Sequence, residues 1–108
     1  MRRDVYKKLV RDRIPEIIEE SGDECVTEVL SDEEYLIKLD EKLSEEVAEY
    51  NESHSIEELA DIYEVVRACA AACGYSINEL ESIRREKAAS CGTFEKKIML
   101  VEVRRKVI

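Results

Sequence analysis

The sequence contains two short groups of acidic residues whose types and spacing could support metal-dependent chemistry. The first group is Glu45, Glu46 and Glu49, and the second is Glu58 and Asp61. Residues three or four apart lie on one side of a helix, so each group would present carboxylates from a single face. Carboxylate oxygens without nearby His or Cys ligands favour Mg²⁺, or Mn²⁺ as a substitute, over zinc. The two groups therefore predict a hard-cation site that could hold a phosphate-bearing substrate.

A simpler interpretation fits the same residues. Glu is a good helix former, and charged helix faces are usually solvated. Glu58 also completes an S-x-x-E capping-box pattern that begins at Ser55. His54 is the only His and falls between the two groups, where an exposed structural role is at least as consistent as proton transfer. Spacing alone leaves the solvated face and the metal site both open.

Two long amphipathic helices are expected to position these carboxylates. Apolar residues recur at intervals of three and four over about 32–53 and again over 55–73. A short turn between the two helices predicts an antiparallel hairpin, which brings Glu49 roughly level with Glu58 and Asp61. Carboxylates that converge at a half-buried seam repel one another unless a cation lies among them.

The remaining elements predict a mainly all-α fold, a helical bundle built on this hairpin. Two further helices are expected near 13–21 and 76–90. Short extended segments are expected near 25–30 and 94–103, where they could pair with each other. A length of 108 residues suits one domain over the whole chain. Because the apolar stripes are large and few elements cover them, we expect a homodimer or a larger assembly.

Composition excludes several classes of function. The net charge of −9 opposes attraction to the nucleic-acid backbone, so binding to DNA or RNA is not expected. The four Cys residues show no CxxC spacing, and the N-terminus has no secretory segment, which indicates reduced thiols in the cytoplasm. No apolar stretch is long enough to cross a bilayer, so no membrane role is expected. No Ser-His-Asp arrangement or glycine-rich phosphate loop can be assembled.

The acidic groups carry a resemblance to a known family. Glu45-Glu46-x-x-Glu49 followed by Glu58-x-x-Asp61 resembles the E-E-x-x-E…E-x-x-D signature of the all-α nucleoside triphosphate pyrophosphatase superfamily, which includes MazG and the phosphoribosyl-ATP pyrophosphohydrolases. Three further segments strengthen the resemblance: YKKLVRDRIP at 6–15, ELADI at 58–62 and GTFEKKI at 92–98. Together they are similar to a compact MazG-like subfamily of predicted house-cleaning pyrophosphohydrolases, over nearly the whole chain.

This resemblance implies a reaction and a set of site residues. The family cleaves nucleoside triphosphates between the α- and β-phosphates, giving a nucleoside monophosphate and pyrophosphate. Glu46, Glu49, Glu58 and Asp61 would bind Mg²⁺, while Glu45 would support a second ion or orient the attacking water. The candidate phosphate contacts are Arg11, Arg13, Lys42, Arg84, Lys87 and Lys96.

The chain departs from the family in two places. Residues 50–57 form a shorter connection between the half-motifs than many relatives have, so no substrate-binding insertion is present there. Residues 90–93 stand where many relatives carry a basic, glycine-rich segment. Two alternatives remain: a phosphoribosyl-ATP pyrophosphohydrolase with a different base pocket, and a non-catalytic helical dimerisation module with a solvated acidic face.

Overall fold

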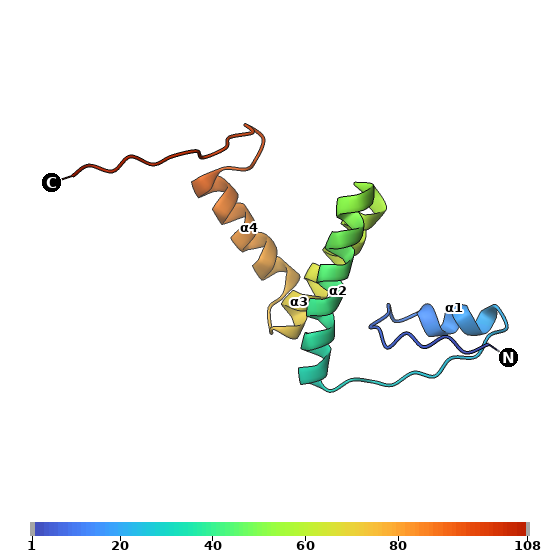
Figure 1. Ribbon diagram of the computed structural model, residues 1–108. Coiled ribbons are helices and arrows are strands. Elements are labelled where there is room, and N and C mark those ends of the chain that lie inside the picture. The colour runs from blue at the N-terminus through green and yellow to red at the C-terminus, as the bar shows by residue number, and fades with distance from the viewer. Residues whose placement is uncertain (1, 108) are drawn as a thin grey trace. The chain divides into compact units, whose positions relative to one another are not determined.

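The protein is all-α in a computed structural model that describes residues 2–107 (Figure 1). These residues form four helices, α1 (Ile14–Glu20), α2 (Asp32–Ser53), α3 (Ile56–Ala72) and α4 (Ile77–Cys91). Each helix begins and ends within one residue of the range predicted from the sequence. The extended segments predicted at 25–30 and 94–103 are not confirmed, since no strand forms among residues 2–107.

Helices α2 and α3 pack against each other as an antiparallel hairpin (Figure 1). Each helix starts at a serine cap: Ser31 Oγ accepts a hydrogen bond from the Glu34 N–H at 3.2 Å, and Ser55 Oγ accepts one from the Glu58 N–H at 3.2 Å. His54 ends α2 in the left-handed region, at φ 52°, and its N–H donates to the Tyr50 carbonyl at 2.7 Å. Only His54 and Ser55 connect the two helices, so the chain reverses within a two-residue turn.

Little of the hairpin is shielded from water. Within residues 2–107, Leu39 at 2% exposure is the only buried apolar side chain and Glu46 at 6% is the only buried polar one. Other apolar residues of the same two helices remain exposed, including Leu36, Val47 and Leu59. The apolar faces of α2 and α3 are therefore only partly covered. Exposed apolar faces of this kind are the reason why a homodimer or larger assembly is expected.

The chain divides into two compact units, Met1–Ile77 and Asn78–Ile108. The first contains the hairpin, α1 and an N-terminal segment (residues 2–13) that precedes α1. The second contains nearly all of α4 and the irregular C-terminal residues. The organisation into a single domain stays a prediction. Within the described part of the chain, none of the helices combines the length and the apolar character needed to cross a bilayer.

Candidate metal centre

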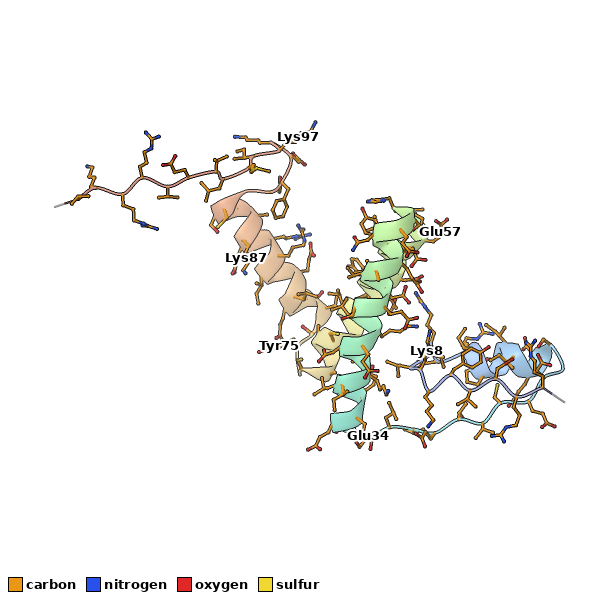
Figure 2. All side chains as sticks on the ribbon, viewed as in Figure 1. Lys8, Glu34, Glu57, Tyr75, Lys87 and Lys97 are labelled. Carbon is orange, nitrogen blue, oxygen red and sulfur yellow. The ribbon has the colours of Figure 1, made fainter. Side chains whose placement is uncertain are left out.

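Three carboxylates converge on the hairpin in the arrangement of a divalent cation site. Glu46 comes from α2, and Glu58 and Asp61 come from the first turns of α3. One oxygen from each lies within 4.8 Å of the others. In Figure 2, Glu34 marks the start of α2 and Glu57 marks the start of α3 at the opposite end of the hairpin. The two acidic groups of the sequence thus meet across the seam between these helices.

The Glu58 side chain does not take part in the capping box that the sequence pattern suggests. In a complete capping box, the Glu side chain would accept a hydrogen bond from the N–H of the N-cap residue. Here the Ser55 N–H donates to Ser53 Oγ at 3.2 Å instead. The backbone cap is therefore complete without the Glu58 carboxylate, which faces the cluster.

Two carboxylate oxygens in the cluster lack hydrogen-bond partners. Glu46 Oε2 and Glu58 Oε2 are both buried, and neither has a partner among the described residues. Buried polar atoms are nearly always paired, because an unpaired one loses its hydration without compensation. A solvated acidic face would leave these oxygens in water, so their burial favours the metal-site interpretation over the solvated one.

The environment of Glu58 disfavours its charged form. Removal from water is the largest cause, and the neighbouring carboxylates of Glu46 and Glu49 add to it, raising the pKa of Glu58 from 4.5 to about 7. A cation bound among these groups would reverse the effect and keep Glu58 ionised.

Without metal, we expect the free energy of unfolding to fall as the pH rises from about 4.5 to about 7. The folded state holds the Glu58 proton up to the raised pKa of about 7, whereas the unfolded chain releases it near 4.5. The stabilisation is therefore complete below the lower value and is lost as the pH passes the higher one. Denaturant unfolding of chelator-treated protein across this window measures the trend. Glu58→Gln cannot ionise and should flatten it, and an identical slope in this variant would contradict the assignment.

Among the described residues, three cations pair with carboxylates of the cluster or with the adjacent Glu45. From the N-terminal segment, Lys8 Nζ donates to Glu45 Oε1 at 3.0 Å and Arg11 Nη2 donates to Asp61 Oδ1 at 2.7 Å. Lys8, labelled in Figure 2, extends from this segment toward α2. Lys42, one turn before Glu46 on α2, places Nζ 3.5 Å from Glu46 Oε1. The site therefore combines acidic ligands with cations that could meet an anionic substrate.

The two other acidic candidates lie beside the three converging carboxylates. The Lys8 hydrogen bond holds the pKa of Glu45 below its usual value, with a further contribution from Lys42, and the same bond raises the pKa of Lys8. Glu49 is exposed, and it is close enough to Glu58 to help raise the pKa of that residue. All five predicted acidic residues therefore belong to one neighbourhood, with Glu46, Glu58 and Asp61 at its centre.

The basic candidates divide into those that contact this neighbourhood and those that do not. Arg11 and Lys42 contact it, whereas Arg13 pairs with Glu16 of α1 at 3.1 Å. The remaining three candidates, Arg84, Lys87 and Lys96, belong to the second unit, and their role in phosphate binding stays a prediction.

Sequence reasoning missed Lys8 as a site residue. Its signal was the local excess of positive charge in the first 13 residues, but charge alone does not show which cation reaches an acidic group 37 residues further along the chain. Lys8 lies three residues before Arg11, and the two residues contact different helices of the hairpin.

Comparisons with known proteins add one partial relative. A stretch of 42 residues, 39% of this chain, is 62% identical to an uncharacterised protein of Mycolicibacterium smegmatis, and it covers 43% of that protein. The chain thus matches less than half the length of this relative. No family model and no solved structure matches the chain.

Proposed function

We propose that the protein is a Mg²⁺-dependent nucleoside triphosphate pyrophosphohydrolase. The observation that carries the proposal is the convergence of Glu46, Glu58 and Asp61, with two buried oxygens that have no partner among the described residues. These three residues are among the four Mg²⁺ ligands that the sequence resemblance implies, and the fourth is Glu49.

The donor set fits a small hard cation. Mg²⁺ binds oxygens at about 2.0–2.1 Å, so its ligands lie at most about 4.2 Å apart. The carboxylate oxygens lie within 4.8 Å of one another, so small side-chain rotations would bring them into this range. Ion pairs join Lys8, Arg11 and Lys42 to the five-carboxylate neighbourhood, leaving two negative charges when all five acids are ionised. One divalent cation balances that charge.

Hydrolysis at such a site needs no covalent intermediate. Bound Mg²⁺ would neutralise phosphate charge and make a coordinated water more acidic. Glu46, Glu58 and Asp61 would hold the ion, and the exposed Glu49 would be a fourth ligand. Glu45 stays ionised beside Lys8 and can accept a hydrogen bond from the attacking water or support a second ion. Lys42, whose Nζ lies 3.5 Å from Glu46 Oε1, would be placed to contact the phosphate chain of a substrate bound to that ion.

The proposal extends to assembly and location. The apolar residues left exposed on α2 and α3 support a homodimer or larger assembly that completes a helical bundle. The four cysteines form no disulfide, which supports a reducing cytoplasmic setting. The substrate is proposed to be a non-canonical nucleoside triphosphate.

We expect the purified protein to release pyrophosphate from nucleoside triphosphates when Mg²⁺ is present, and to stop when a chelator is added. A panel of ordinary and damaged nucleotides, scored for pyrophosphate and nucleoside monophosphate, tests this expectation. Equal amounts of the two products identify cleavage between the α- and β-phosphates. Release of inorganic phosphate alone would contradict the proposed bond.

The same panel, with phosphoribosyl-ATP added, separates the alternatives. Activity confined to phosphoribosyl-ATP would assign the protein to that reaction, which shares the chemistry and differs in the base pocket. Absence of turnover on every substrate, together with a stable assembly, would favour the non-catalytic dimerisation module.

A further inference from the structure

The N-terminal segment lies against the proposed metal site and is anchored there by two cations. Lys8 pairs with Glu45 on α2, and Arg11 pairs with Asp61 on α3. Both contacts join residues far apart in sequence, separated by 37 and 50 positions. No such contact is made by Arg2 or Arg13, which pair with acidic residues two and three positions away.

Asp61 has two roles that conflict. It belongs to the three converging carboxylates, and its Oδ1 also accepts the Arg11 hydrogen bond at 2.7 Å. A guanidinium this close to a candidate ligand carboxylate repels an incoming divalent cation and competes for that carboxylate. Lys42 Nζ lies 3.5 Å from Glu46 Oε1, but Glu46 and Glu58 each also keep a buried oxygen without a partner among the described residues, through which a metal could reach them.

We propose that Arg11 is a displaceable counter-ion, which neutralises Asp61 in the metal-free protein and binds substrate phosphate once the metal takes its place. The inference rests on the proposed metal site and adds a coupling between metal and substrate. The Arg11 side chain is 57% exposed, so it can leave Asp61 without disturbing a packed core. Its planar fork of donors matches two phosphate oxygens at once, which a lysine cannot do.

The counter-ion role and a purely structural role predict opposite changes in metal affinity when Arg11 is removed. If the Arg11–Asp61 pair only holds the N-terminal segment in place, removing Arg11 should weaken the binding of metal and anion together. If Arg11 is a displaceable counter-ion, its removal should strengthen metal binding, because the competitor is gone, and weaken anion binding, because the phosphate contact is gone.

The test is calorimetric titration of Mn²⁺ into metal-free protein, followed by inorganic pyrophosphate into Mn²⁺-saturated protein. For Arg11→Gln we expect Mn²⁺ to bind about tenfold tighter and pyrophosphate about tenfold weaker, the scale of one charge-assisted contact. Arg2→Gln makes the same charge change in the same segment and should leave both affinities within about twofold. Arg11→Lys keeps the positive charge without the fork, so Mn²⁺ affinity should stay near wild type while pyrophosphate affinity falls.

The outcomes distinguish failure of the counter-ion role from failure of the proposed metal site. Opposite shifts in Arg11→Gln, with Arg2→Gln unchanged, support the counter-ion role. Wild-type binding of Mn²⁺ with no gain in Arg11→Gln overturns that role and leaves the metal site standing. Failure of both wild type and Arg11→Gln to bind Mn²⁺ overturns the metal site and the inference together. Should Arg11→Gln not fold, a parallel loss of both affinities in Arg11→Lys would identify a structural anchor and reject the proposal.

Discussion

Replacing Asp61 by Asn is expected to lower the rate of pyrophosphate release by about 10²-fold or more, the scale of losing one positioned electrostatic contact. The amide keeps the size of the side chain and removes one negative charge from the cluster of Glu46, Glu58 and Asp61. Glu46→Gln should have an effect of similar size, because Glu46 is the most buried of the three. Glu49→Gln tests whether the exposed rim carboxylate also binds the ion. Steady-state assays at saturating Mg²⁺ measure these losses.

The matched control for these variants is Glu64→Gln. Glu64 is exposed on α3, one turn after Asp61, and is not among the converging carboxylates. The same change of charge there should leave turnover within a few fold of wild type. Circular dichroism should show wild-type helix content in all the variants. Near-wild-type turnover in both Asp61→Asn and Glu46→Gln would refute the assigned mechanism.

Mg²⁺ is expected to raise the melting temperature of the wild-type protein by about 5 °C or more. A ligand at ten times its Kd stabilises the folded state by about 1.4 kcal/mol, and about 1 kcal/mol corresponds to about 4–8 °C in a domain of this size. The physical reason is that the ion supplies partners for the unpaired oxygens of Glu46 and Glu58. Thermal unfolding with chelator and with millimolar Mg²⁺ measures the shift.

Glu46→Gln should abolish the stabilisation by Mg²⁺. Without metal, the loss of one repelling carboxylate should make the variant at least as stable as wild type, and added Mg²⁺ should produce little further change.

Calcium should stabilise the wild type without supporting turnover, because its looser coordination positions water less tightly. A wild-type melting temperature indifferent to Mg²⁺ would count against the site.

The helices could be predicted because their signals are local. Apolar residues at helical spacing and the caps at Ser31 and Ser55 determine where α2 and α3 begin, and the structure agrees within one residue. The segments 25–30 and 94–103 have β-compatible composition but form no strand. A strand requires a partner at the correct distance, which composition cannot specify.

The acidic side of the site was predictable for the same reason, whereas the basic side was predicted only in part. Arg11 and Lys42 were among the six basic candidates, and Lys8 was not. Glu58 and Asp61 share one helix face by spacing alone, and the short turn brings them opposite Glu46. Lys8 and Arg11 lie in a segment without regular structure, so no periodicity indicates which way their side chains point. Their partners on the hairpin depend on tertiary structure, as does the burial that raises the pKa of Glu58.

The two-residue connection between α2 and α3 restricts how this sequence can diverge. Surface loops usually tolerate insertions and deletions. A residue added to or removed from His54 and Ser55 that the turn did not absorb would shift α3 by about 100° and about 1.5 Å relative to α2. Because Asp61 and the apolar residues of α3 belong to one helix, such a shift would move both away from their partners on α2. At residue 54 the left-handed conformation favours glycine or asparagine, so these two residues should be tolerated there better than other replacements.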